Sequence, residues 1–142
     1  MSPTKTVRKP RKRDVSAGEV PSPSAAAVKR LEREPNLWLA TVRGSGEPHL
    51  VPVWFAYEAG RLHVCTDPKS VKVRNIRARS SVVVALEGGD RPVIAYGKAQ
   101  LLSRPWPPRV VAAFKRKYDW DIEKGSTYSS LLTIEPSRWI EW

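Results

Sequence analysis

The segment LWLATVRGSGEPHLVPVWFAYEAGRLHVCT, Leu37–Thr66, decides how the rest of the chain is interpreted. Apolar side chains alternate with other residues in LWLATVR, in HLVPVWFAY and in RLHVCT, which is the period of a half-buried β-strand. Gly44–Pro48 supplies the glycines of a hairpin loop between the first two stretches, and Glu58–Gly60 makes the next turn. The segment therefore predicts three consecutive strands that form an antiparallel meander.

Strand-like stretches continue towards the C-terminus, with turns about eight to twelve residues apart, a spacing typical of antiparallel barrels and sandwiches. These stretches are Ser81–Glu87, Arg91–Leu102, Tyr128–Pro136 and Arg138–Trp142. Two other stretches have apolar residues at helical spacing: Ala25–Glu34, preceded by Ser24 as a cap, and Arg109–Trp120, with Val110, Val111 and Phe114 inward. The sequence predicts a mainly β fold with six or seven strands and few helices.

A third helix is predicted directly after the third strand, in TDPKSVKVRNIRARS, Thr66–Ser80. Asp67 followed by Pro68 is typical of a helix start, with a capping residue before a proline at the first helical position. Lys69 and Lys72 then lie beside the positive end of the helix dipole, where a cation is unfavourable. A bound anion would remove this conflict.

The charges of this helix point to a phosphate site or to a solvated surface. Five cations and no acid lie between positions 69 and 79: Lys69, Lys72, Arg74, Arg77 and Arg79. Backbone amides at the helix start, the Ser70 hydroxyl and the Lys72 ammonium can converge on a phosphate, with Asn75 one turn further on. The alternative interpretation is a basic helix face that contacts only water.

The chain has 142 residues, enough for one domain, and a formal net charge of +11, which favours anionic partners. Residues 1–24 are rich in proline, serine and cations and are predicted to be a disordered basic tail, while residues 25–142 form the folded domain. The tail is either an arm for nucleic acid or a membrane surface, or a solubilising segment. It contains no aromatic residue to stack on a base, which favours the second interpretation.

Several kinds of site are not expected. Cys65 is the one cysteine, and His49 and His63 are the two histidines, so we expect no disulfide and no metal site. His63 and Cys65 lie two positions apart on one strand, a poor geometry for a nucleophile and its base, and we interpret both as packing residues. No catalytic side chain is assigned. No stretch is apolar enough for a transmembrane helix and no secretory signal is recognised, so we expect a cytoplasmic location.

Pro52 and Trp54 make the second strand unusual. A proline in mid-strand cannot donate to a ladder, so we expect an edge or a bulge at Pro52, with backbone groups left free near a ligand. Trp54 beside it is interpreted as a core or dimer-interface residue, or as a platform for a flat ring.

Six tryptophans are many for a chain of this length, and four of them lie in the C-terminal third: Trp106, Trp120, Trp139 and Trp142. Tryptophan is enriched at protein interfaces, so dimerisation explains this cluster economically. A cofactor wall contributed across such an interface is the second interpretation.

Residues 37–102 resemble the pyridoxamine 5'-phosphate oxidase-like superfamily of flavin- and deazaflavin-binding split β-barrels. The resemblance rests on G-x-P-H before the second strand, P-V-W-F within it, T-D-x-x-S-x-K-x-R-N-I after the third, and G-x-A-x-L at Gly97–Leu101. It implies a six-stranded antiparallel split barrel of the FMN-binding type. It also implies a homodimer with the cofactors bound in clefts between the protomers.

The resemblance implies site residues as well. Three helix residues would hold the cofactor phosphate: Ser70, Lys72 and Asn75. Three strand residues would line the ring through their backbone and face: Pro52, Val53 and Trp54. Thr66 would contact the phosphate or the ribityl chain, and Arg74 and Arg91 would add positive charge beyond the phosphate. Trp106 is included as the wall residue contributed across the interface.

The pattern K-x-R-N-I in a short chain resembles the branch that uses coenzyme F-420, whose phosphate carries an oligoglutamate tail. Cations beyond the phosphate site suit such a polyanion: Arg74, Arg77, Arg79 and Arg91. FMN and haem are the alternative ligands. The true oxidases bind vitamin B6 with an Arg and a His near the C-terminus, and no histidine follows His63 here, so oxidation of vitamin B6 is not expected.

We expect a cofactor-dependent oxidoreductase that passes hydride from reduced coenzyme F-420, or from FMN, to a small unsaturated substrate. The alternatives are a flavin- or haem-binding barrel without turnover, which stores or senses its ligand, and a basic barrel that binds nucleic acid through the arm.

Overall fold

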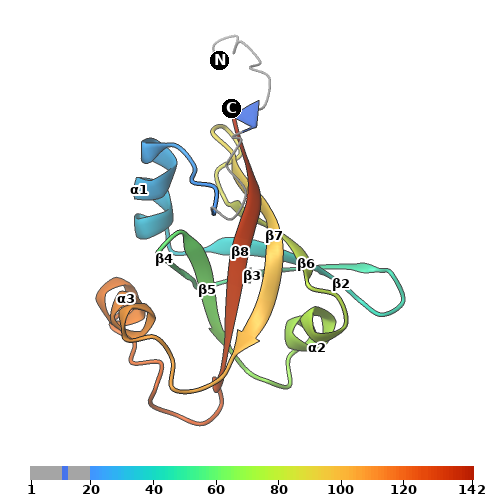
Figure 1. Ribbon diagram of the computed structural model, residues 1–142, viewed down its shortest axis with the longest axis vertical. Coiled ribbons are helices and arrows are strands. Elements are labelled where there is room, and N and C mark those ends of the chain that lie inside the picture. The colour runs from blue at the N-terminus through green and yellow to red at the C-terminus, as the bar shows by residue number, and fades with distance from the viewer. Residues whose placement is uncertain (1–10, 13–19) are drawn as a thin grey trace.

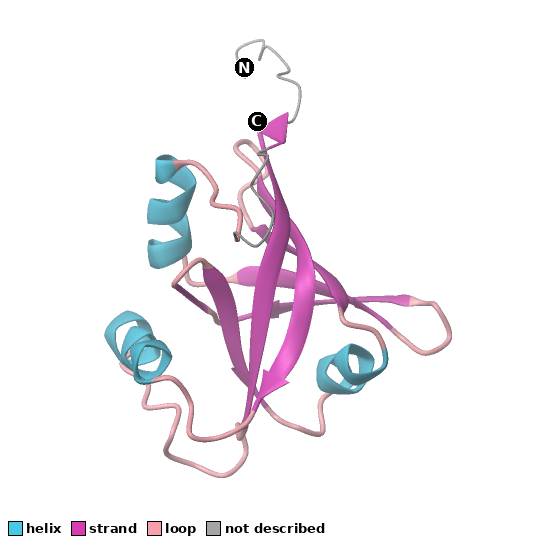
Figure 2. Ribbon diagram, in the orientation of Figure 1, coloured by secondary structure: helices cyan, strands magenta, loops and turns pink. Residues whose placement is uncertain are grey.

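The computed structural model of the protein describes residues 11–12 and 20–142, with side chains from residue 20 onwards. Its elements in chain order are β1 (Arg11–Lys12), α1 (Ala25–Arg33), β2 (Leu37–Val42), β3 (Pro48–Val53), β4 (Ala56–Glu58), β5 (Arg61–Thr66), α2 (Val71–Ala78), β6 (Ser81–Leu86), β7 (Val93–Leu102), α3 (Pro108–Tyr118) and β8 (Ser130–Glu141). Strands predominate (Figure 2), which confirms the mainly β fold.

The strands form one curled antiparallel sheet, a half-barrel, in the order β3-β2-β6-β7-β8-β5-β4, and β1 pairs with the end of β8. The long strand β8 lies at the centre of the view in Figure 1, between β7 and β5. In the same view α2 lies on one side of the sheet, and α1 and α3 lie on the other. The antiparallel architecture is confirmed, but the main path of the sheet has seven strands, where the family resemblance implies six.

The second predicted strand is divided in the structure. β3 and β4 lie at opposite edges of the sheet, and Trp54 and Phe55 connect them. The Phe55 N–H donates to the Tyr118 hydroxyl over 3.0 Å, and the Lys117 ammonium donates to the Phe55 carbonyl over 3.1 Å. Side chains of α3 thus take the place of a neighbouring strand as hydrogen-bond partners of the Phe55 backbone. The predicted pairings exist as β2 with β3 and β4 with β5, but the second strand of the predicted meander is two strands, so β5 pairs with β4 and β8 and not with β3. The edge position expected from Pro52 is confirmed.

The two strands predicted at the C-terminus are one strand, β8. Its register against β7 shifts between Tyr96 and Gly97. A Cβ on Gly97 would lie 2.5 Å from the carbonyl oxygen of Glu135, too close for any side chain. Glycine at this position therefore lets β8 continue past the register shift without a break. This explains why the G-x-A-x-L pattern begins with glycine.

α1 and α3 lie where the sequence predicts them, within two residues at each end. The Ser24 hydroxyl accepts a hydrogen bond from the Ala27 N–H over 3.1 Å, which confirms the cap of α1. Within the described part of the chain, no helix has the length and apolar character needed to cross a bilayer.

α2 begins later than predicted. Its first residue is Val71 and its capping position is Ser70. Asp67 is not the cap: its carboxylate accepts a hydrogen bond from the Lys69 N–H over 2.8 Å and so closes a turn before the helix. As a result Lys69 lies outside the helix, whereas Lys72 lies in its first turn, as expected.

Two clusters of buried apolar side chains stabilise the fold. The first fills the half-barrel and includes Leu39, Val64, Val84 and Trp139. The second lies beneath α3 and includes Trp106, Val110, Phe114 and Leu131. Trp106 is 3% exposed and Trp139 is 1% exposed, so an interface is the wrong explanation for these two tryptophans. Each belongs to the core of its own chain.

The two polar candidates of β5 are packing residues, as the sequence predicts. His63 is 4% exposed, and its Nδ1 lies 3.0 Å from the Thr133 hydroxyl oxygen. Burial lowers the pKa of His63 to about 4 and raises the pKa of Cys65 to about 11. Both side chains are therefore neutral at pH 7, and the thiol is not a nucleophile there.

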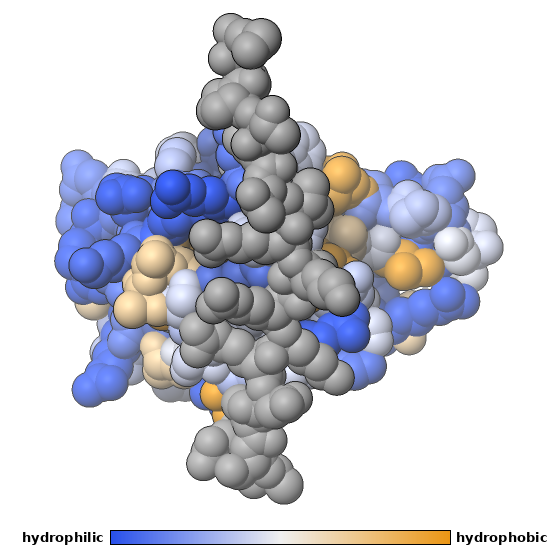
Figure 3. Space-filling view, turned by 90° about the horizontal axis from the view of Figure 1, so that it is seen from above, coloured by the Kyte–Doolittle hydropathy of each residue, from blue (hydrophilic) through white to orange (hydrophobic). Residues whose placement is uncertain are grey.

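Part of the outer face of the sheet is apolar, although Lys98 and Arg138 lie on the same face beside it. Cross-strand neighbours on β3, β2, β6 and β7 share this face: Leu50, Pro52, Trp38, Ala40, Val83, Ala85, Ile94 and Tyr96. Leu50 is 59% exposed and Trp38 is 37% exposed. Figure 3 shows small hydrophobic areas on both halves of the view, within a largely hydrophilic surface. A sheet face that meets only water ordinarily carries polar side chains, so this face, the outer apolar face, lacks a partner within the described chain.

Packing of the chain begins before residue 25. The Trp139 indole N–H donates to the Pro21 carbonyl over 3.0 Å, and the Ser24 N–H donates to the Glu141 carboxylate over 2.9 Å. Arg11 and Lys12 form β1, which pairs with Glu141 and Ile140 of β8. The rest of the predicted tail, residues 1–10 and 13–19, lies outside the described residues.

We expect Gly97→Ala to lower the free energy of unfolding by about 1–3 kcal/mol, because the added methyl group meets backbone that cannot easily move aside. The matched control is Gly89→Ala, since a Cβ at Gly89 meets nothing within 4 Å. Urea unfolding of both variants measures the difference. Equal stabilities would contradict the close approach of β8 to Gly97.

Candidate anion-binding site

The turn between β5 and α2 builds the candidate site. β5 ends at Thr66, the Ser70 N–H donates to the Asp67 carbonyl over 3.0 Å, and α2 begins at Val71. No side chain caps α2, and the Ser70 hydroxyl oxygen is enclosed without a hydrogen-bond partner among the described residues. The first N–H groups of α2 are therefore available to a ligand, at the positive end of the helix dipole.

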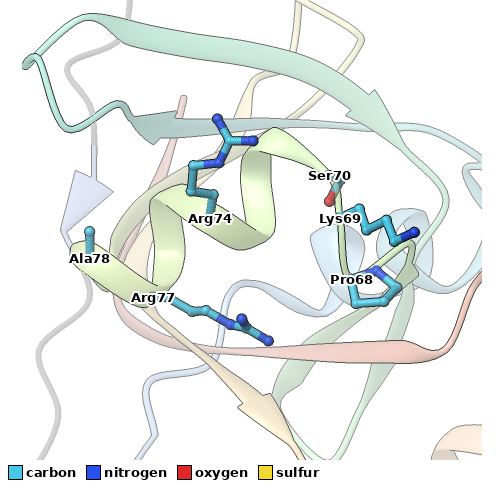
Figure 4. Close-up of a pocket in the computed structure, with 6 residues that line it drawn as sticks. All are labelled: Pro68, Lys69, Ser70, Arg74, Arg77 and Ala78. Carbon is cyan, nitrogen blue, oxygen red and sulfur yellow. The ribbon is translucent and has the colours of Figure 1, made fainter.

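An open pocket of about 570 Å³ runs along the exposed side of α2 (Figure 4). The residues that line it are Pro68, Lys69, Ser70, Arg74, Arg77 and Ala78. Figure 4 shows the side chains of Arg74 and Arg77 extending from the helix in different directions, while Lys69 and Ser70 lie at its start. No acid lines the pocket, so its charge is positive.

Ser70 and Arg74 are the predicted cofactor residues that line this pocket. Lys69 and Arg77 also line it. The sequence named Arg77 only as one of the cations that suit a polyanionic tail, and it gave Lys69 no cofactor contact. The spacing of three residues between Arg74 and Arg77 places both on one helix face.

Lys72 approaches the same helix start from the other side. With about 3.6 residues per turn, Lys72 lies across the helix from Arg74 and Arg77, and it does not line the pocket. Side chains on a helix lean towards its N-terminus, so the ammonium of a first-turn lysine lies near the turn that precedes the helix. Lys72 is half-buried, and burial lowers its pKa, an effect that the Asp67 carboxylate partly opposes. Among the described residues, none forms a hydrogen bond or an ion pair with its ammonium.

Thr66 and Asn75 support the site from behind and do not line the pocket. Both are 3% exposed. The Asn75 side-chain amide donates to the Thr41 hydroxyl over 2.9 Å and so ties α2 to β2. Thr66 pairs with Ser130 at the end of β5, directly before the turn. In one chain, these two residues hold the turn and the helix in place.

Pro52, Val53 and Trp54 lie apart from the pocket. They belong to the end of β3 and to the connection into β4. Trp54 is 51% exposed and stacks on Tyr118 of α3, with ring centroids 4.5 Å apart and an interplanar angle of 4°. Since α3 and α2 lie on different sides of the sheet in Figure 1, one chain does not bring Trp54 to the α2 pocket.

The last two predicted residues are also distant from α2. Arg91 is exposed in the turn between β6 and β7, beyond the end of β6 that is far from α2. A strand rises about 3.3 Å per residue, so the length of β6 separates Arg91 from the pocket. Trp106 belongs to the core beneath α3, where its indole N–H donates to the Leu102 carbonyl over 3.3 Å. We leave both residues out of the site proposed below.

Metal ions have no evident ligand set. No group of three or more His, Cys, Asp and Glu side chains that could hold a metal is found among the residues that the structure describes.

Solved structures with this fold have several different names. The conserved hypothetical protein Rv2991 from Mycobacterium tuberculosis is 22% identical, with a TM-score of 0.68, over 91% of this chain and 89% of that chain. An F420 reductase is 24% identical, with a TM-score of 0.61, over 78% of this chain and 93% of that chain. HutZ, the haem storage protein from Vibrio cholerae, is 16% identical, with a TM-score of 0.68, over 82% of this chain and 94% of that chain. At these identities the likeness shows the fold alone.

The family is shown by the sequence itself. A search of curated protein sequences found no match. A family model described as pyridoxamine 5'-phosphate oxidase matches residues 24–142, a range that includes the whole sheet path from β2 to β8 as well as the turn and helix of the candidate site. The chain therefore belongs to the pyridoxamine 5'-phosphate oxidase family.

Proposed function

We propose that this protein binds the phosphate of a flavin or deazaflavin cofactor at the start of α2 and works as an oxidoreductase. The observation that carries the proposal is Lys72, a half-buried ammonium that forms no hydrogen bond or ion pair with the described residues and is only partly compensated by the Asp67 carboxylate. A buried cation without a partner is unfavourable, and a bound anion removes that cost. The Ser70 hydroxyl, which also lacks a partner in the described chain, and the free N–H groups of α2 supply hydrogen bonds to the same anion.

The residues of this chain bind and orient the cofactor in this proposal. Ser70, Lys72 and the first N–H groups of α2 hold the phosphate, while Thr66 and Asn75 fix the turn and the helix behind it. The bound cofactor supplies hydride transfer, with a small unsaturated molecule as the acceptor. No side chain is assigned a catalytic role.

Coenzyme F-420 is proposed as the cofactor in preference to FMN. An eight-residue helix is about 12 Å long, and the pocket follows α2 from Ser70 to Ala78, so the cationic surface extends well beyond one phosphate. FMN ends at its phosphate, whereas an oligoglutamate tail continues and can pair with Arg74 and Arg77. The similarity to a structure named as an F420 reductase supports the same choice.

A second copy of the chain is proposed to complete the site. The pocket is lined by cations, a serine, a proline and an alanine, and it offers little apolar wall for a flat ring system. The outer apolar face supplies a surface that a second copy can cover. In such a homodimer, the Pro52–Trp54 segment of one protomer can line the ring of a cofactor whose phosphate is held by α2 of its partner.

Titration of the apo-protein with coenzyme F-420 and with FMN tests the cofactor proposal. We expect Lys72→Ala to weaken both affinities by about 1.5–3 kcal/mol, the range for a hydrogen bond to a charged group. Arg77→Ala is expected to weaken the binding of coenzyme F-420 more than that of FMN. Added salt is expected to lower the affinity for coenzyme F-420 more steeply than the affinity for FMN. The matched control is Lys115→Ala on α3, which makes the same charge change at a lysine paired with Asp119.

Two outcomes would overturn parts of this proposal. Unchanged affinities in a folded Lys72→Ala protein would remove α2 as the phosphate site. Equal affinities and equal salt slopes for the two cofactors would favour FMN. A haem titration of the same protein, followed by absorbance, tests the storage alternative suggested by the name of HutZ.

The dimer proposal predicts the effect of a charge on the outer apolar face. Leu50→Glu places a carboxylate on a side chain that is 59% exposed in one chain, so the fold should tolerate it. We expect this variant to be a monomer in sedimentation velocity at micromolar concentration and to bind the cofactor weakly, whereas the wild type is a dimer that buries roughly 1,600 Å² or more. Ala112→Glu on the exposed side of α3 is the control. A wild-type monomer that binds cofactor tightly would contradict the shared site.

A further inference from the structure

The last turn of α3 carries a lysine that the phosphate site does not use. The Lys117 ammonium donates to the backbone carbonyl of Leu31 on α1 and to that of Phe55 between β3 and β4, each over 3.1 Å. Its nitrogen also lies 3.6 Å from the centroid of the Phe55 ring. Three segments that are distant in sequence, α1, the β3–β4 connection and α3, therefore meet at one side-chain nitrogen. We call this meeting point the Lys117 junction.

Both carbonyls depend on Lys117, because neither has its ordinary backbone partner. The Leu31 carbonyl lies in the last turn of α1, and the residue four positions on is Pro35, which has no N–H to donate. Phe55 lies between two strands and pairs with no strand itself. The Tyr118 hydroxyl lies 3.1 Å from the Phe55 carbonyl, but its single proton has a closer acceptor in the Pro35 carbonyl, at 2.7 Å.

The Lys117 junction requires an ammonium and not an amine. A charged lysine has three N–H groups, and here the two carbonyls and the face of the Phe55 ring take one each. A neutral amine has two N–H groups and a lone pair. Loss of the proton therefore leaves one of the three acceptors without a donor and turns the lone pair towards a carbonyl oxygen or the ring face, which is unfavourable.

The surroundings of Lys117 bring the loss of its proton into an accessible pH range. The side chain is half-buried, and no acid of the described residues lies within ion-pair distance of its ammonium. Burial lowers the pKa of Lys117 to about 8, an effect that the Glu34 carboxylate at the end of α1 partly opposes. The Glu34 carboxylate is itself paired with Arg30.

Three other titratable side chains of the adjoining elements stay neutral between pH 7 and 9. Burial raises the pKa of Tyr118 and that of Tyr57 on β4, and it lowers the pKa of His63 on β5 to about 4. The charged side chains of the elements packed against Lys117 are Lys29, Arg30, Glu32, Arg33 and Glu34 of α1, Glu58 of β4, and Arg109, Lys115 and Arg116 of α3. None of these nine donates to the Leu31 or Phe55 carbonyl, so Lys117 is the group whose charge the junction depends on.

We propose that Lys117 is a positioning residue: its ammonium holds the β3–β4 connection in its observed conformation, and loss of its proton releases that connection. The segment Pro52–Trp54 directly precedes Phe55, so the release would move the residues that line the cofactor ring in the proposed homodimer. This consequence for the cofactor rests on the proposed function, whereas the release itself does not.

The release is local and does not unfold the protein. Between pH 8 and the ordinary lysine value of 10.5, Lys117 binds less proton in the folded protein than in the unfolded chain. Its contribution to the free energy of unfolding is therefore lowest below pH 8 and rises across this window. Relative to Lys117→Met, the wild type should become more stable as the pH rises from 8 to 10.5, although the junction opens.

The chain has two phenylalanines, Phe55 and Phe114, which makes a direct test possible. Protein labelled with carbonyl-13C phenylalanine gives two signals in nuclear magnetic resonance spectra, and the Phe114 carbonyl, which lies within α3, is the internal reference. We expect the Phe55 signal of the wild type to move with a midpoint near pH 8. The movement should be absent in Lys117→Met and Lys117→Arg, whose side chains do not titrate here, and should persist in the matched control Lys115→Met on the same helix.

The affinity for coenzyme F-420 gives a second measurement. Tight binding requires the charged form of Lys117 in this proposal, and the charged share falls from roughly nine tenths at pH 7 to roughly one tenth at pH 9. The Kd of the wild type should therefore rise about 10-fold more over this range than the Kd of Lys117→Arg, which keeps its charge. Lys72 is present in both proteins, so its own titration cancels in the comparison.

Two results would overturn the inference. The first is a Phe55 signal that does not move in the wild type, or that moves equally in Lys117→Arg; neither depends on whether Lys117→Met folds. The second is an equal change of Kd with pH in the wild type and in Lys117→Arg, which would remove the positioning role. The proposed function fails separately: a wild type that shows the Phe55 transition but binds no cofactor at pH 7 keeps the Lys117 junction and loses the oxidoreductase.

Discussion

The hydrogen bonds between α3 and the Phe55 backbone fix the way in which the sheet curls. Tyr118 and Lys117 form hydrogen bonds with the Phe55 N–H and carbonyl. The chain can therefore leave β3 at one edge of the sheet and start β4 at the other edge without leaving these backbone groups unpaired. β4 then leads into β5, which pairs with β8 and ends at the turn before α2. The position of the candidate site thus depends on a contact made on the other side of the sheet.

The same contact separates two surfaces with different chemistry. On the α2 side, the pocket has cations without acids, and Lys72 is half-buried without an ion-pair partner in the described chain. On the α3 side, the cations Lys115 and Lys124 lie beside acids, and aromatic rings form the surface. An anionic group suits the first surface, whereas the second consists of aromatic rings beside the last turn of α3, which also carries Arg116 and Lys117. A homodimer through the outer apolar face is the proposed means of bringing the two together.

The strands β2, β3, β6 and β7 were predictable because buried and more exposed residues alternate along them. The hairpin from β2 to β3 follows from its glycines. The division of the second strand was not predictable from periodicity, since alternation continues from His49 through Tyr57 while the partner changes. Only the distant residues Lys117 and Tyr118 reveal the break. The predicted start of α2 was wrong because Asp67-Pro68 is compatible both with a helix cap and with a turn that precedes the helix. In the structure the Lys69 N–H donates to the Asp67 carboxylate, which makes the segment a turn.

The sequence could predict that the candidate site binds an anion, but it could not predict all the residues that form the site. The cationic run and the place of α2 after a strand identified the anion site, and Ser70 and Lys72 keep their predicted positions at the helix start. Arg91 and Trp106 could not be placed from sequence, because their distance from α2 depends on the direction of β6 and on the packing beneath α3. Trp54 likewise needs the fold, since its neighbour Tyr118 is contributed by a helix far along the chain.

The central claim is that an anion at the start of α2 neutralises Lys72. Nuclear magnetic resonance of the Lys72 side-chain nitrogen, titrated with and without bound coenzyme F-420, measures this directly. In the free protein burial lowers the pKa of Lys72, and a phosphate beside the ammonium favours its charged form. The account predicts that the pKa of Lys72 rises when the cofactor binds, while the pKa of Lys115 on α3, which the Asp119 carboxylate raises, does not change with the ligand. A Lys72 pKa that is the same in the free and the bound protein would contradict it.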